Sequence, residues 1–202
     1  MIDKVDEDRI ALAIAEAEKK TAGEIVVVVG HSASGYHLVP IVWAGFVTLA
    51  LPAVLLAIFN ISARLLYEIE LIVFGALAFV LSFGRYRYQL VPRRVKRHRA
   101  HETAREQFMA RRIWQTRAHT GVLIYVALAE RYAELVPDSG ISEQLDDAIW
   151  KPVIVRLVES VKQGHAAEGI VAAVESCGAI LAQHLPPQGD NPDELPNKVV
   201  LL

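Results

Sequence analysis

The sequence is poor in cysteine. Its single cysteine, Cys177, lies in an apolar stretch with helical spacing, so the 202-residue chain can form no internal disulfide framework and gives no sign of needing an oxidising compartment. We interpret Cys177 as a small buried hydrophobic residue rather than a reactive thiol. The sequence also lacks a P-loop, a GxSxG motif and a cysteine followed by a glycine-rich loop and an arginine. No familiar nucleophile site for a phosphatase is therefore evident.

The first twenty residues lack the short apolar core of a signal peptide. Acidic residues come early, and Ile10, Leu12 and Ile14 with intervening alanines predict an amphipathic helix instead. We therefore expect no cleaved export signal.

Residues 85–99, RYRYQLVPRRVKRHR, contain no acidic residue although the whole chain has a formal net charge of −2. The remainder of the chain holds 14 basic and 23 acidic residues, because seven of the 21 basic residues lie in this run. An acidic remainder would repel nucleic acid, so we do not expect nucleic acid as a partner. The run instead predicts a membrane-interface segment formed by Arg85, Arg87, Arg93, Arg94, Lys96, Arg97 and Arg99.

Two apolar segments explain why 53% of the residues are hydrophobic and the mean hydropathy is +0.30. Residues 38–59 carry no charge, and as a helix they span about 33 Å, enough for a bilayer core of roughly 30 Å. Residues 65–84 form a second span, with Glu68 and Glu70 near its start at the expected headgroup level. Residues 60–63 connect them. The sequence thus predicts a transmembrane helical hairpin; the alternative is two buried helices of a soluble core.

The distribution of positive charge predicts the orientation of this hairpin. Only Arg64 lies on the connector side, whereas Lys19, Lys20 and the basic run lie on the other side. We expect a multi-pass protein of the inner or plasma membrane, in contact with the lipid bilayer, with both termini and the folded domain in the cytoplasm.

The rest of the chain has the pattern of an interrupted α/β domain. Residues 25–29 (IVVVV) and 121–129 are continuous apolar runs, typical of buried strands, and residues 97–116 between them have helical spacing. Residues 132–136 follow after about two residues, which predicts an antiparallel strand pair. The predicted organisation is a first domain part over 1–35, the hairpin over 36–84, the basic segment over 85–99, and the remaining domain and tail over 100–202.

The C-terminal third is predicted to be helical. Ser142 could cap a short helix that extends to Ile149, Pro152 suits the first turn of the next helix, and Gly164 suits its end. A last apolar helix is expected over 166–185, before an extended, proline-rich tail.

An ordered set of segments resembles the TPM-domain family, whose members include thylakoid lumen proteins linked to photosystem II repair. The set comprises TAGEIVVVV, TGVLIYVALAERYAELVPDSGI, Trp150, the spacing from Gly164 to Gly169, and LPPQGDNPDELPNKVV. The resemblance implies an α/β sandwich with a mixed sheet, a role in membrane assembly or maintenance, and the acid phosphatase activity and calcium binding reported for some members. Asp138 retains the acid of the family's Gly-Asp pair, but Pro137 replaces the glycine.

Four acidic residues are candidate ligands for Ca²⁺ or Mg²⁺, because hard cations need several carboxylate or carbonyl oxygens. They are Asp138, at the end of a predicted strand, and Asp190, Asp193 and Glu194 in the tail. Alternatively, Asp138 is a turn or helix-cap residue and the tail acids form a solvated turn whose Leu195 packs on the core. Glu24 could join the four, although a contact with solvent or a helix cap is the alternative.

His98 and His101 have a spacing that can hold a transition metal, but no third ligand accompanies them, so a surface or headgroup contact is favoured. The main hypothesis for function is therefore a membrane-anchored module that binds, assembles or maintains membrane proteins, with a membrane protein or a second copy as partner. The alternatives are a divalent-metal-dependent phosphatase and, less favoured, nucleic-acid binding through the basic run.

Overall fold

The computed structural model describes residues 2–36, 38–187 and 194–202. The chain forms two compact units. The first comprises Met1–Ala33 and Arg97–Leu202, and the second comprises Ser34–Lys96.

The first unit contains a mixed four-stranded sheet with the order β3-β2-β1-β4. The strands are β1 (Glu24–Gly30), β2 (Gly121–Ala127), β3 (Tyr132–Pro137) and β4 (Val199–Leu201). Strand β1 runs parallel to β2 and β4, and β3 runs antiparallel to β2. All seven residues of β1 and of β2 are buried, as expected for apolar runs covered on both faces. The predicted mixed sheet and α/β fold are confirmed.

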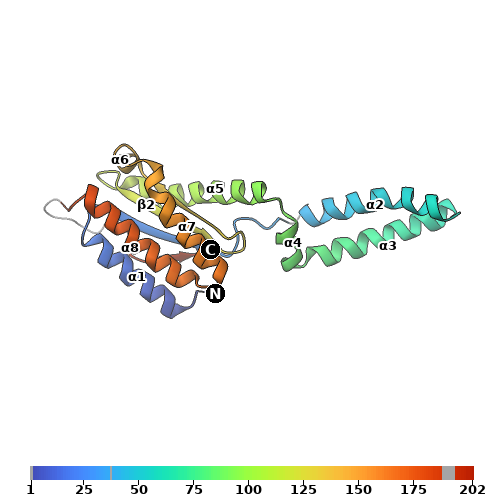
Figure 1. Cartoon of the computed structure of the whole chain (residues 1–202), viewed down its shortest axis with the longest axis horizontal. Helices are drawn as coiled ribbons and strands as arrows, with labels where there is room; N and C mark the ends of the chain where they lie inside the picture. The colour runs from blue at the N-terminus through green and yellow to red at the C-terminus, as the bar shows by residue number, and fades with distance from the viewer. Residues whose placement is uncertain (1, 37, 188–193) are drawn as a thin grey trace. The chain divides into compact units, whose positions relative to one another are not determined.

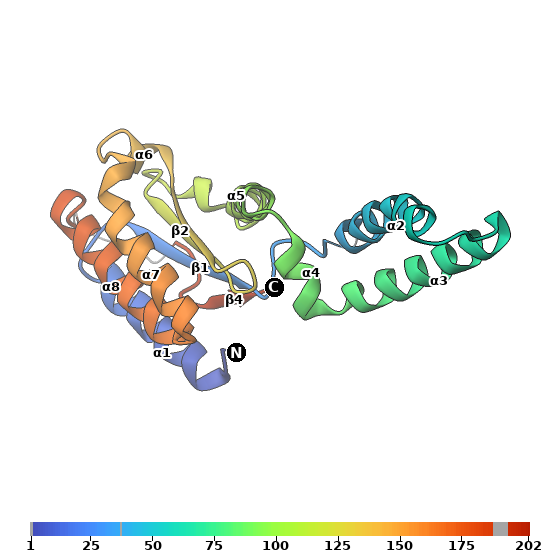
Figure 2. The same ribbon diagram turned by 45° about the vertical axis from the view of Figure 1, so that its right-hand side comes forward.

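Helices cover both faces of this sheet (Figures 1 and 2). One face packs against α1 (Lys4–Glu18), α7 (Lys151–Gln163) and α8 (Ala166–His184), in a core that includes Ile14, Ile124 and Leu181. The other face packs against α5 (Arg93–Ala110) through Ala100 and Ala104. Small residues let this helix lie close to the sheet. Leu12 of α1 is 66% exposed, so it does not belong to the buried face on which the sequence places it.

The crossover helix differs from its predicted bounds at both ends. It begins at Arg93 rather than residue 97 and ends at Ala110 rather than residue 116. Arg112 adopts a left-handed conformation with φ 56°, and a 3₁₀ helix, η1 (Ile113–Gln115), follows. The left-handed residue ends the helix because it redirects the chain toward β2.

The connection between β2 and β3 comprises residues 128–131, longer than the two residues that the sequence predicts. Ala127 pairs with Tyr132, and the N–H groups of Leu128 and Ala129 donate to the carbonyls of Gly30 and His31, at 3.0 and 2.9 Å. These residues therefore continue the contact with β1 after β2 has ended.

Asp138, not Ser142, caps the helix that follows the sheet. Its side chain accepts from the N–H of Ser139 at the start of α6 (Ser139–Ser142), and a separate 3₁₀ helix, η2 (Asp147–Trp150), precedes α7. The prediction of one helix capped by Ser142 is therefore wrong, because the aspartate one turn earlier provides the cap. Pro152 in the first turn of α7 and Gly164 at its end, with φ 88°, match the prediction.

The second unit consists of α2 (Leu38–Ile58), α3 (Ala63–Ser82) and α4 (Gly84–Leu90). Ser62 caps α3 through the N–H of Leu65. Helices α2, α3 and α8 are long and apolar enough to cross a membrane. The buried share is 11% for α2, 0% for α3 and 44% for α8. Helix α8 packs in the core of the first unit, whereas α2 and α3 leave most of their apolar side chains exposed.

Candidate functional site

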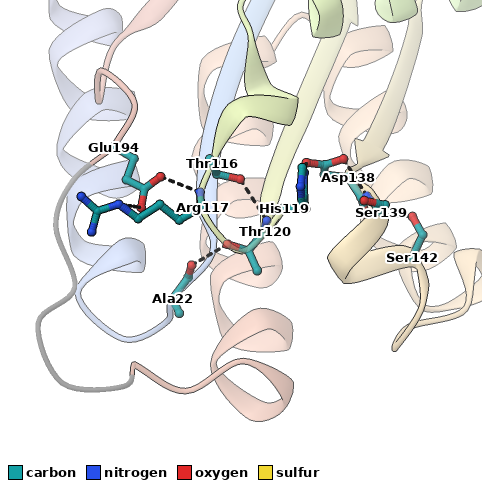
Figure 3. Close-up of polar contacts among 9 residues, drawn as sticks. All are labelled: Ala22, Thr116, Arg117, His119, Thr120, Asp138, Ser139, Ser142 and Glu194. Atoms are coloured by element: carbon teal, nitrogen blue, oxygen red, sulfur yellow. Dashed lines mark hydrogen bonds and ion pairs between the residues drawn. The ribbon is translucent and has the colours of Figure 1, made fainter.

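Polar side chains gather where β1 and β2 begin, in the loops of the first unit (Figure 3). These loops carry Thr116, Arg117, His119 and Thr120 before β2, and Asp138 lies beside them because β3 runs antiparallel to β2 and ends there. The tail residue Glu194 approaches from the other side of the threonines, as Figure 3 shows. Sheet topology therefore brings residues from three distant segments to one edge.

Thr116 and Thr120 hold the loop before β2 in place. The N–H of Thr120 donates to Oγ1 of Thr116 at 3.0 Å, and Oγ1 of Thr120 donates to the carbonyl of Ala22 at 2.9 Å. Both threonines are buried, so these hydrogen bonds satisfy groups that water does not reach. The loop is thereby fixed to the segment that enters β1.

Glu24, the first residue of β1, binds the C-terminal tail. Its carboxylate accepts from the N–H groups of Glu194 at 3.4 Å and Leu195 at 3.2 Å. Glu24 is only 5% exposed, so a contact with solvent, which was one alternative for this residue, does not describe its surroundings. Leu195 packs against the sheet core on the α5 side, as the alternative for the tail expects.

Glu194 in turn binds the loop before β2. Its Oε2 accepts from the N–H of Arg117 at 2.9 Å, and its Oε1 lies 3.7 Å from Nε of the same arginine. The tail and the loop thus hold each other through a charge-assisted hydrogen bond.

Asp138 combines a helix cap with a contact to His119. Oδ1 accepts from the N–H of Ser139 at 2.7 Å, and Oδ2 lies 3.2 Å from Nδ1 of His119. The N–H of Gly140 donates to the carbonyl of His119 at 3.1 Å, and a Cβ at Gly140 would lie 2.8 Å from that oxygen. Only glycine permits this close approach of the two loops. Asp138 is thus a helix-cap residue, as the alternative to a metal ligand predicted.

The predicted metal site stays a prediction. Asp190 and Asp193 lie outside the described residues, and Asp138 and Glu194 contact different partners. Within residues 2–36, 38–187 and 194–202, no group of three or more His, Cys, Asp or Glu side chains is arranged to hold a metal ion. Ca²⁺ or Mg²⁺ would thus need oxygen ligands from the tail acids beyond the described ranges.

His98 and His101 take separate partners. Nε2 of His98 lies 3.2 Å from Glu102, and Nδ1 of His101 lies 2.8 Å from Glu134 of β3. Both contacts are ion pairs when the histidine is protonated, and they use one ring nitrogen of each residue.

The basic residues of the run 85–99 are divided between α4 and the start of α5. The guanidinium of Arg87 lies 5.2 Å from the ring centre of Tyr88, and Arg99 pairs with Glu102 at 3.1 Å. The side chain of Arg85 lies outside the described side chains. Arg93, Arg94 and Arg97 are exposed and Lys96 is half-buried, so their role at a membrane interface stays a prediction.

Cys177 is fully buried in α8, and burial raises the pKa of its thiol to about 12. The interpretation of this residue as a buried hydrophobic side chain is confirmed. A thiol with this pKa stays protonated at neutral pH and is a poor nucleophile.

The sequence named Glu24 only as a possible further metal ligand and did not reveal the tail clamp, in which its carboxylate accepts from the N–H groups of Glu194 and Leu195. An acidic residue at the start of a fully apolar strand is a usable signal, because a buried carboxylate needs donors close by. The identity of those donors, in a tail 170 residues away, carries no local signal.

Comparison with known proteins agrees with this architecture. The TPM domain family model matches residues 89–180. No curated protein matches the chain. A solved structure with a similar fold is the NMR structure of the BA42 protein from the psychrophilic bacterium Bizionia argentinensis, with a TM-score of 0.62 and 22% sequence identity, covering 100% of this chain and 95% of that one. The resemblance of this chain to the TPM-domain family is therefore confirmed.

Proposed function

We propose that this protein is a membrane-anchored TPM-domain module that binds membrane proteins during their assembly or maintenance. The observation that carries the proposal is the apolar surface of the hairpin. Phe46, Leu49, Ile72 and Phe79 are between 64% and 76% exposed. Water would disfavour such a surface by roughly 25 cal/mol per Å², whereas lipid chains would cover it at no such cost.

The position of the hairpin in the chain also supports an anchor. It lies between β1 and α5, inside the crossover that joins two parallel strands. A domain that begins before the hairpin and is completed after it is joined to the hairpin at two points of the chain. Such an arrangement suits a module that must stay beside membrane-embedded partners.

The charge distribution supports a cytoplasmic domain. Arg64, on the connector side, pairs with Glu68 at 3.1 Å, so this side carries no net positive charge from that pair. The basic run and Lys19 and Lys20 are on the opposite side of the spans in the chain. Both termini and the α/β domain then face the cytoplasm.

The metal-dependent phosphatase is not favoured over this proposal. The described carboxylates at the site each accept hydrogen bonds from backbone N–H groups, which gives them a structural task. Among the described residues, no cluster of metal ligands is present that could support a metal-dependent phosphatase reaction.

Membrane extraction and native mass test the proposal. The full chain is expected to stay in the membrane pellet at alkaline pH, and in mild detergent to migrate at the mass of a complex with another membrane protein. Release at alkaline pH would overturn the anchor. A monomer in every mild detergent would overturn the binding role.

A further inference from the structure

Strand β3 is an edge of the sheet, and its outer side has no strand partner among the described residues. The N–H of Asp138 donates to the carbonyl of Gly121 at 2.9 Å, in the same register that pairs Leu123 with Val136 and Tyr125 with Glu134. Because hydrogen-bonded pairs alternate along antiparallel strands, Glu134 and Val136 bond to β2. The N–H and C=O groups of Ala133 and Leu135 therefore point away from β2, to the open edge.

A groove of about 720 Å³ runs along this open edge. Its floor is the beginning of β3, one wall is α5 and the other wall is α7. Figure 2 shows the β2–β3 hairpin between these two helices. Pro137 has no N–H group to offer, so pairing with a further strand is possible only beside Ala133 and Leu135.

The two walls differ in chemistry. The α7 wall presents Ile154, Val155 and Val158, and Val155 is 67% exposed although it is apolar. The α5 wall presents Arg97, His98 and His101. A strand laid beside β3 would turn alternate side chains to the two walls, because side chains alternate between the faces of a sheet.

The two acidic residues of the groove already have partners within the chain. Glu134 accepts from the hydroxyl of Tyr132 at 2.7 Å and lies 2.8 Å from Nδ1 of His101. Glu159 pairs with Lys162 at 3.2 Å. Arg97 and Arg131 line the groove and have no ion pair within the described part of the chain. The groove therefore has positive charge to share with a ligand.

Arg131 keeps a left-handed backbone, with φ 51°, at the start of the groove. This backbone conformation is uncommon for residues other than glycine and asparagine. Arg131 lines the groove at this position, so its positive charge lies beside the start of β3.

We propose that this groove binds an extended segment of a partner protein, in which acidic and apolar residues alternate, as a fifth strand beside β3. Its backbone pairs with Ala133 and Leu135, its apolar side chains pack on the α7 wall, and its carboxylates face Arg97 and Arg131. The inference rests on the proposed function, because the segment belongs to the protein that the anchored module holds.

The test uses the full chain in nanodiscs and a fluorescent eight-residue peptide of alternating Glu and Val, with blocked ends. We expect saturable binding and at least about tenfold slower hydrogen exchange at the amides of Ala133 and Leu135 when the peptide is bound. The amides of Glu134 and Val136 are expected to be slow in both states. A peptide N-methylated at alternate residues loses the backbone donors and should bind at least about tenfold more weakly.

Matched variants separate charge from strand pairing. Arg97→Gln and Arg131→Gly should each weaken binding of the Glu-Val peptide about threefold. A peptide of alternating Lys and Val should lose more than about threefold in affinity for the unchanged protein, because it meets both arginines with like charge. Arg105→Gln is the control, because Arg105 is an exposed arginine of α5 that does not line the groove. It should leave binding unchanged.

Three outcomes would overturn the inference. They are equal binding of the N-methylated peptide, no protection of Ala133 and Leu135, and protection that depends on protein concentration without peptide, which would identify a second copy as the occupant. Each leaves membrane extraction unaffected, so failure of this inference is distinguishable from failure of the anchor.

Discussion

Helices α8 and α2 are both long and apolar enough to cross a membrane, but they differ in what covers them. In α8, 44% of the apolar window is buried, by residues of α1, α7 and the sheet. In α2 the buried share is 11%, and in its partner α3 it is 0%. By length and composition alone, α2, α3 and α8 could each cross a membrane. The packing of the protein assigns α8 to the domain core and leaves the surface of α2 and α3 for another environment.

The same contrast separates the two units as wholes. In the α/β unit, apolar side chains such as Val27 and Ile124 are fully buried, and the buried hydroxyl of Thr120 is hydrogen-bonded to another segment. In the hairpin, apolar side chains such as Phe46 and Ile72 are largely exposed. A substitution in the α/β unit should therefore lower the stability of the domain, whereas one in the hairpin should leave that stability unchanged.

The largest effect is expected from a charge placed in each unit. Val27→Asp puts a carboxylate into the fully buried centre of β1, and we expect it to unfold the domain, by more than about 4 kcal/mol. Val47→Asp, at a position 48% exposed in α2, should leave the thermal midpoint of the domain unchanged but reduce membrane insertion. Circular dichroism melting and membrane fractionation measure the two effects. Equal loss of domain stability in both variants would contradict the division.

A single methyl group gives the next largest effect. A Cβ at Gly121 would lie 2.8 Å from the carbonyl oxygen of Ile113, whereas a Cβ at Gly45 of α2 would have no neighbour within 4 Å. Gly121→Ala should destabilise the domain by roughly 1–3 kcal/mol, because backbone must move to admit the methyl. Gly45→Ala should leave the domain midpoint unchanged. Chemical denaturation of the two variants checks this difference.

Removal of the tail clamp should cost less. Glu24→Gln keeps an acceptor but loses the charge that binds the N–H groups of Glu194 and Leu195, and we expect a loss of about 1 kcal/mol. Hydrogen exchange at residues 194 and 195 should become faster. The exposed residue Glu143 supplies a control, since Glu143→Gln should change neither quantity. Unchanged exchange in Glu24→Gln would show that other contacts hold the tail.

The smallest effect is expected at alkaline pH. Burial raises the pKa of the Cys177 thiol from its ordinary value of 9.0 to about 12, so the folded state retains the proton when the unfolded state has lost it. Stability from this group is complete below pH 9 and decreases as the pH rises toward 12, by about 1 kcal/mol at pH 10. Cys177→Ala should show a smaller decrease between pH 8 and pH 10. Unfolding experiments at both pH values measure it.

Much of the fold was predictable because its signals are local. A run of four valines is typical of a strand covered on both faces, and Pro152 and Gly164 mark the ends of α7 by their own backbone preferences. The two hairpin helices were predictable because each is a long, mainly apolar segment, which is also a local property of the sequence. The order of these elements predicted a βαβ unit and an antiparallel strand pair, and the resemblance to the TPM-domain family implied the mixed sheet.

The candidate site was predictable only in part. Asp138 was identified, but its cap and its contact with His119 depend on how two loops meet at Gly140. The tail clamp on Glu24 and the left-handed Arg112 that shortens α5 depend on contacts far apart in the chain. Such contacts leave no periodic pattern in the sequence.

The most direct test of the anchored arrangement is labelling of intact cells with a membrane-impermeant maleimide. Cys177 provides a silent background, because it is fully buried with a raised pKa. Asn60→Cys lies in the exposed connector between α2 and α3, and Leu202→Cys lies at the exposed C-terminus. We predict labelling of Asn60→Cys from outside, and labelling of Leu202→Cys only after the cells are opened. Labelling of Leu202→Cys in intact cells, with Asn60→Cys protected, would contradict the account.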